Sequence, residues 1–268
     1  MKKSLTAGDF HICPLECGGT SSLEAFARAT KDLGARSLTV EIPSGCKPDR
    51  EMLAVRDAYA GSVDVLFSST VDFSAPTDLP FMPDVRVAAL KTLCVNGKQY
   101  VLENDRKVLT ALLDAFDGSA RSMLREVCTA FTPDTNVQYD AVILPDFDGW
   151  RAELDTLWNV DEGLMRQYMI ELADRWIDAD TVFAVRMISI PFCDGVMVAP
   201  GPSAMVLRRI GERRGRVTLM SGARSVEALY QNFDLAAVQL IACGIPNWYL
   251  PTKNGWEGFS LRYNYKKI

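Results

Sequence analysis

Residues 37–67 constrain the fold most, because they switch between the repeats of a strand and of a helix. Residues 37–42 alternate polar and apolar side chains, which predicts a strand that ends at Pro43-Ser44-Gly45. Residues 49–60 have the pattern of a helix closed by Gly61, and residues 63–67 predict a second strand. A strand, a helix and a strand in this order are typical of an α/β layer.

The rest of the chain continues this mixture of elements. Asn96-Gly97 stands between two strand-like stretches and predicts a two-residue hairpin. The remaining patterns predict helices at residues 107–116, 121–131 and 161–176, and strands at residues 141–144 and 182–190. We therefore expect an α/β protein with a mixed sheet covered by helices. Residues 1–84 would form a βαβ-like N-terminal elaboration and residues 85–268 the main domain, together in one compact unit.

Composition excludes several classes of function. The net charge is -5, from 29 basic and 34 acidic residues, which argues against a dedicated nucleic-acid binder. One local basic cluster is present, formed by Arg208, Arg209, Arg213, Arg214 and Arg216. No apolar run approaches the roughly 20 residues that span a membrane, and no signal peptide is apparent. The odd number of scattered cysteines, 7, predicts reduced thiols and a cytoplasmic location.

Histidine usage limits metal chemistry. His11 is the only histidine of the chain, so a multi-histidine metal site is not expected. His11, Cys13 and Cys17 have the character of a metal half-site. No matching Cys or His pair follows nearby, and we therefore predict no bound metal.

The strongest concentration of candidate site residues lies in residues 187–243. Cys193 is the leading candidate nucleophile, and Arg224 with Ser225 could hold a phosphate in a forked geometry. Asn232 and Asp234 could bind the edge of a heterocyclic base. The alternatives stay open here: Cys193 as a small core residue, and the Asn and Asp as caps of a helix.

The order of these residues resembles a known family. Pro191-Phe192-Cys193, Arg224-Ser225 with Glu227, and Asn232-Phe233-Asp234 are similar to motifs of the thymidylate synthase and deoxycytidylate hydroxymethylase superfamily. Gly149-Trp150-Arg151 resembles the Trp-Arg turn of that family, and residues 111–118 resemble one of its helices. Ala111 stands where the family has its catalytic Glu. The resemblance covers roughly residues 105–243.

The resemblance implies a thymidylate-synthase-like fold and an enzyme. It implies a methyl- or hydroxymethyltransferase acting on C5 of a pyrimidine nucleotide, with Cys193 adding to the ring. Arg224, Ser225, Asn232, Asp234 and Trp150 would bind the substrate. The implied cofactor is methylenetetrahydrofolate, and the implied assembly is a homodimer. The alternative is a non-catalytic interaction or assembly protein, in a viral setting for example, which the missing Glu at Ala111 favours.

Overall fold

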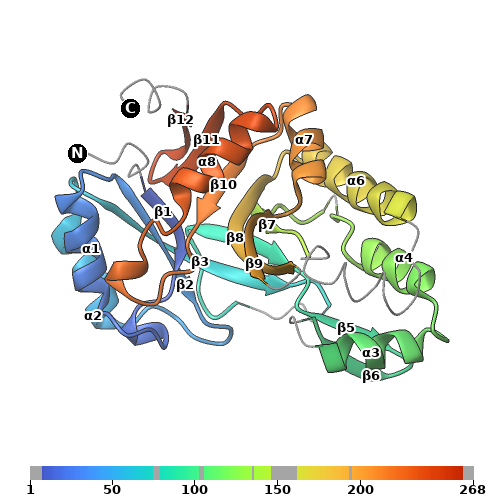
Figure 1. Cartoon of the computed structure of the whole chain (residues 1–268). Coiled ribbons are helices and arrows are strands. Elements are labelled where there is room, and N and C mark those ends of the chain that lie inside the picture. Colours follow the sequence, from blue (N-terminus) through green and yellow to red (C-terminus); the bar gives the residue numbers. More distant parts are fainter. Residues whose placement is uncertain are drawn as a thin grey trace.

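Seven parallel strands form a closed barrel in the computed structural model (Figure 1). The structure describes residues 8–74, 79–102, 106–134, 136–145, 162–192 and 195–261. The barrel strands follow one another in space as β1 (Gly8–Ile12), β2 (Ser37–Ile42), β3 (Asp64–Asp72), β4 (Val85–Ala89), β7 (Ala141–Ile143), β8 (Val182–Phe192) and β10 (Val217–Met220). Pairing of β10 with both β8 and β1 closes the ring.

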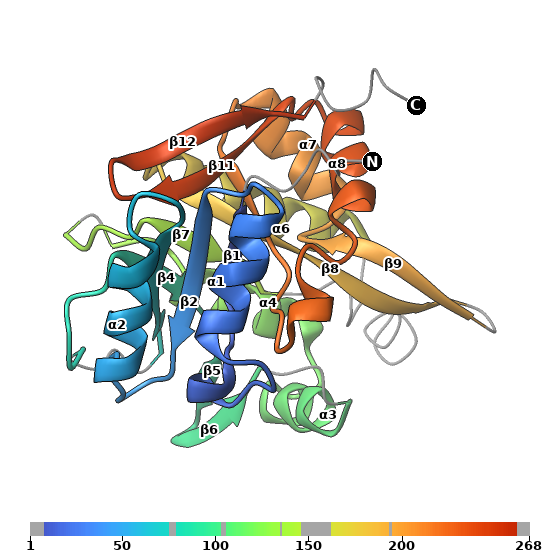
Figure 2. The same cartoon turned by 90° about the vertical axis from the view of Figure 1, so that its left-hand side faces the viewer.

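Helices surround the barrel in two groups (Figures 1 and 2). The helices are α1 (Leu23–Asp32), α2 (Arg50–Tyr59), α3 (Arg106–Ala115), α4 (Ala120–Ala130), α6 (Glu162–Asp178), α7 (Ala204–Glu212) and α8 (Phe233–Ala242), with the short turns η1 (Leu15–Cys17) and η2 (Val226–Ala228). Apolar side chains of α1 and α2 share one buried cluster with β1, β2 and β3. A larger cluster joins α3, α4, α6, α7 and α8 to the other side of the barrel.

Local capping explains where two of these helices begin. The Ser22 hydroxyl accepts a hydrogen bond from the Ala25 N–H, and an Asp49 carboxylate oxygen accepts one from the Met52 N–H at 2.8 Å. Each cap satisfies a backbone donor that has no partner within its helix. The predicted hairpin is confirmed as β5 (Thr92–Val95) and β6 (Lys98–Val101), with positive φ at Asn96 and Gly97.

A third cluster fills the barrel interior with inward-facing apolar residues of its strands. Strand β2 contributes no apolar residue to this interior cluster. Its apolar residues Leu38, Val40 and Ile42 face outward and belong to the cluster beneath α1 and α2. Its inward positions are therefore Ser37, Thr39 and Glu41, which are polar. The polar face of β2 thus faces the barrel interior.

The amino-terminal end of the barrel is covered by a hairpin of β11 (Asn247–Thr252) and β12 (Gly255–Ser260) (Figure 2). The Ser37 hydroxyl donates to the Pro251 carbonyl at 2.5 Å, and the Lys253 N–H donates to Asp64 at 3.3 Å. Ser37 and Asp64 begin β2 and β3, so these contacts fix the hairpin at that end. The hairpin therefore lies over the end of the barrel opposite the carboxyl ends of its strands.

The α/β class with a sheet covered by helices is confirmed, but the thymidylate-synthase-like fold is wrong. The reason is the ring of parallel strands, to which one antiparallel strand, β9 (Gly195–Gly201), is added by pairing with β8 (Figure 2). Strands β3 and β4 lie on opposite sides of residue 84 and pair directly, so both predicted segments contribute to one barrel.

Most of the arginine-rich cluster lies on or next to helix α7. Helix α7 buries Val206, Leu207 and Ile210 against the neighbouring helices. Arg209 donates two hydrogen bonds to Asp174 at 2.8 and 2.9 Å. The further ion pairs join Arg213 to Asp178 and Arg216 to Asp180. These pairs offset much of the positive charge of the cluster; the absence of a nucleic-acid partner stays a prediction.

In the part of the chain that the structure describes, every helix is too short or too polar to cross a lipid bilayer.

Candidate functional site

A cavity of about 550 Å³ opens at the carboxyl ends of the barrel strands. We call it the barrel mouth. Its polar lining is His11, Glu41, Thr70, Lys91 and Arg186, and its apolar lining includes Leu102, Ile143, Leu144 and Met220. Parallel α/β barrels place their active sites at this end, because the loops that follow the strands converge there.

The backbone of β1 directs His11 toward the mouth. The pairing of β1 with β2 shifts register between Asp9 and Ile12, so that β1 carries one residue more than its partner. His11 adopts φ of 71°, an uncommon conformation for a residue other than glycine. Such bulges redirect a side chain and are frequent beside active sites. We therefore take His11 as the central residue of the site.

His11 is hydrogen-bonded to Glu41 of the adjacent strand. Its Nε2 lies 2.5 Å from a Glu41 carboxylate oxygen. The Thr70 hydroxyl donates to the other oxygen of Glu41 at 2.9 Å, and the Lys91 Nζ lies 3.7 Å from it. Burial favours the neutral acid, but His11, Lys91 and Thr70 outweigh burial and lower the pKa of Glu41 to about 2. The carboxylate is thus ionised and orients the imidazole through one nitrogen.

The other nitrogen of His11, Nδ1, is buried and has no hydrogen-bond partner in the described part of the chain. A buried polar atom without a partner is uncommon and is often explained by a bound molecule or by catalysis. With Nε2 bound to Glu41, Nδ1 is the nitrogen available to accept a proton.

Lys91 is held in place through its backbone. Its N–H donates to Asp72 at 3.2 Å, and the Thr92 hydroxyl donates to the same carboxylate at 2.8 Å. The Lys91 side chain is half exposed, and Arg186, from β8, is exposed. Together they bring two positive charges to a cavity whose described lining has one carboxylate, Glu41. The mouth therefore attracts anions.

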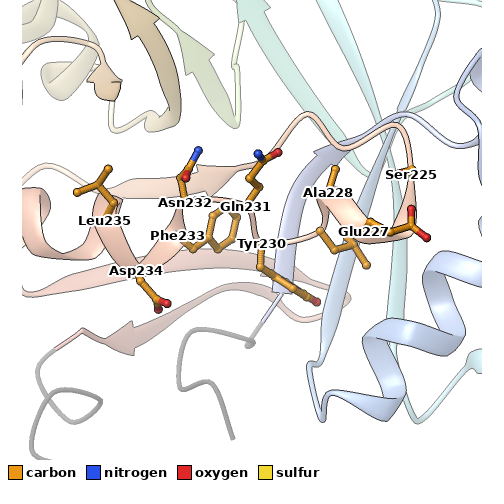
Figure 3. Close-up of a pocket in the computed structure, with 10 residues that line it drawn as sticks. Ser225, Glu227, Ala228, Tyr230, Gln231, Asn232, Phe233, Asp234 and Leu235 are labelled. Atoms are coloured by element: carbon orange, nitrogen blue, oxygen red, sulfur yellow. The ribbon is translucent and has the colours of Figure 1, made fainter. Parts of the chain in front are cut away.

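A second cavity, of about 620 Å³, lies at the start of α8 (Figure 3). Ser225, Asn232 and Asp234, predicted to bind substrate, line it, whereas exposed Arg224 precedes it and does not appear in its lining. Figure 3 shows the Asn232 and Asp234 side chains pointing in different directions. The cavity is formed by one continuous segment and has no Lys or Arg in its described lining. Its role in binding stays a prediction, as do those of Cys193 and Trp150, which lie outside the described residues.

The half-site of His11, Cys13 and Cys17 is not assembled as a set of thiolate ligands. The Cys13 thiol donates to the Cys17 carbonyl at 2.9 Å. Burial, with smaller contributions from neighbouring thiols and carboxylates, raises the pKa of Cys17 to about 12. Burial therefore favours the protonated form of the Cys17 thiol.

No protein-family model matches this chain, and no curated protein matches its sequence. Solved structures do share its fold. A protein described as a histidinol phosphatase from Listeria monocytogenes superimposes with a TM-score of 0.59 at 10% identity, covering 85% of this chain and 98% of that one. Histidinol phosphate phosphatase from Lactococcus lactis, solved with zinc, L-histidinol and phosphate, gives 0.57 at 10% identity, covering 95% and 100%.

These likenesses correct the interpretation of the sequence. The chain shares the fold of these barrel proteins, so its resemblance to thymidylate synthase is wrong. The predicted C5 transfer to a pyrimidine nucleotide is therefore wrong, and so is the predicted folate cofactor, because both rested on that resemblance alone. The homodimer and the nucleotide partner stay predictions.

A zinc centre like that implied by the Lactococcus structure does not fit the residues of this mouth. His11 is the only histidine, and the described residues contain no group of three or more His, Cys, Asp or Glu side chains able to hold a metal ion. Lys91 and Arg186 also bring positive charge to the cavity, which opposes binding of a cation.

The residues of the mouth lie far apart in the sequence and were not predicted to form one site. Glu41 and Thr70 lie at the ends of strands β2 and β3, and Lys91 follows strand β4. Polar residues at the carboxyl ends of successive parallel strands were a usable signal, because these ends meet at one face of a barrel.

Proposed function

We propose that this protein is a hydrolase that acts on a small phosphate monoester at the barrel mouth. One observation carries the proposal: the paired His11 and Glu41 line the same cavity as Lys91 and Arg186, at the carboxyl ends of the strands. The fold likeness to two proteins described as phosphatases supports it. An anionic substrate suits the positive charge of the mouth.

In the proposed reaction, Lys91 and Arg186 hold the oxygens of the phosphate group. Glu41 fixes the imidazole of His11, whose buried Nδ1 turns toward the mouth when the substrate binds. Nδ1 then accepts a proton from a water molecule as the oxygen of that water bonds to phosphorus. The bond between phosphorus and the ester oxygen breaks, and its electron pair leaves with the alcohol oxygen. That oxygen takes up the proton from His11, so the products are an alcohol and inorganic phosphate. No step passes through a metal ion.

A second candidate is binding of a phosphorylated ligand without turnover. It is favoured by the donor set of the mouth, which among the described residues does not include the ligands of a metal centre. This candidate corresponds to the non-catalytic interaction protein that the sequence left as an alternative. We also propose a cytoplasmic location, which the free thiols of the described cysteines support.

Replacing Lys91 by alanine is expected to weaken the binding of inorganic phosphate about 10- to 100-fold, because a charge-assisted hydrogen bond contributes about 1.5–3 kcal/mol. Isothermal titration calorimetry measures this change. Lys98→Ala is the matched control, since Lys98 is exposed on β6 and lies over the Tyr100 ring at 5.0 Å. Equal affinities of wild type and Lys91→Ala would contradict the proposal. Release of phosphate from phenyl phosphate then separates the hydrolase from the binding protein.

A further inference from the structure

We infer that the alcohol part of the substrate is uncharged and apolar, and that the mouth discriminates against phosphate esters of amino alcohols. The inference rests on the proposed function and defines the substrate class of the same site. It also separates this protein from the Lactococcus phosphatase, whose structure contains L-histidinol, a cationic amino alcohol.

The carboxylate of the mouth is already occupied by partners within the protein. Glu41 contacts His11 with one oxygen, and Thr70 and Lys91 with the other. An ammonium group of a substrate would have to displace one of these partners. The displaced group would then be left in a partly buried site without its counter-charge or hydrogen bond, which is unfavourable.

The charges that line the mouth also disfavour a cationic alcohol part. Lys91 and Arg186 line the cavity, and no carboxylate besides Glu41 is found in its described lining. These two side chains attract the phosphate of any ester, but they repel a second positive charge on the alcohol part. Discrimination of this kind arises from a repulsive element as well as from favourable contacts.

Apolar side chains form one wall of the mouth. Ile143 and Leu144 come from the region of β7, which lies across the ring from β1 and β2. Leu102 lies beside Lys91, because its N–H donates to the Lys91 carbonyl at 2.6 Å. Leu102 is partly buried, so an apolar group of a ligand can still cover it. A phosphate held at Lys91 therefore places the alcohol part next to apolar side chains.

The test compares phenyl phosphate, O-phosphoethanolamine and inorganic phosphate by calorimetry with the full chain. Phenyl phosphate is expected to bind about 10- to 100-fold more tightly than O-phosphoethanolamine, as expected when an aromatic ring leaves water. Leu102→Ser is expected to weaken phenyl phosphate binding about tenfold and to leave inorganic phosphate unchanged. Val101→Ser is the matched control, since the neighbouring Val101 is 47% exposed and does not appear in the lining of the mouth.

Each outcome decides a separate claim. Equal or tighter binding of O-phosphoethanolamine overturns the inference, while binding of inorganic phosphate still supports the proposed site. A loss of phenyl phosphate affinity in Val101→Ser as large as in Leu102→Ser also overturns the inference. Failure of all three probes to bind overturns both the inference and the proposed function.

Discussion

Replacing Glu41 by glutamine is expected to lower the rate of phosphate release about 100- to 10,000-fold, the range typical of lost acid–base catalysis. Glutamine cannot offer His11 the ionised partner that Glu41 provides at 2.5 Å. An amide can also present its NH2 group to Nε2, which favours the other tautomer and takes Nδ1 out of its role as proton acceptor. Most of the effect should fall on kcat, because the phosphate is held by Lys91 and Arg186.

Two comparisons separate this positioning role of Glu41 from a loss of folding. Glu24→Gln is the matched control, since Glu24 is exposed on α1 and forms an ion pair with Arg28. The Glu41→Gln protein should keep its affinity for inorganic phosphate to within a few fold. A Glu41→Gln protein that releases phosphate as fast as wild type would contradict the proposed role of the pair.

Replacing Asp9 by alanine is expected to reduce the free energy of unfolding by about 2–6 kcal/mol, because two buried backbone donors lose their acceptor. Asp9 is fully buried in β1. Its carboxylate accepts hydrogen bonds from the Ser221 N–H at 3.0 Å and the Tyr230 N–H at 3.2 Å. These bonds tie β1 to the segment after β10. Chemical denaturation measures the loss, and Asp57→Ala, at an 80% exposed side chain, is expected to change stability by less than about 0.5 kcal/mol.

The pH dependence of stability provides an independent test of Asp9. Burial raises its pKa from 3.8 to about 6 despite the hydrogen bonds from Ser221 and Tyr230. The protonated acid is therefore favoured by folding. The stability that it contributes is fully present below pH 3.8 and is lost as the pH rises through about 6. Over that interval wild type should lose roughly 3 kcal/mol relative to Asp9→Asn, which does not titrate. Parallel stability profiles of the two proteins would contradict this assignment.

The sequence by itself determined the local elements, because strands, caps and tight turns depend on neighbouring residues. The pattern of residues 37–42 predicted β2, and residues 49–60 predicted α2, whose cap at Asp49 is local. Asn96-Gly97 predicted its hairpin, since both residues accept positive φ. These features established the α/β class.

Closure of the barrel was decided only by the tertiary structure. Phe10 of β1 pairs with Met220 of β10, and the two residues are far apart in the sequence. The residues of neither strand predict which strand it pairs with, because strand pairing depends on the whole ring. Motif matching within residues 187–243 therefore led to the wrong family.

The candidate site shows the same division. The alternation of β2 placed Glu41 on a polar face, but a polar face ordinarily points to solvent. Here that face points into the barrel, where the shifted register of β1 brings His11 within 2.5 Å of Glu41. Sequence identified His11 as the only histidine, and the ring of strands decided its partner. The physical reason is that side-chain direction follows from local alternation, whereas what lies opposite depends on contacts between distant segments.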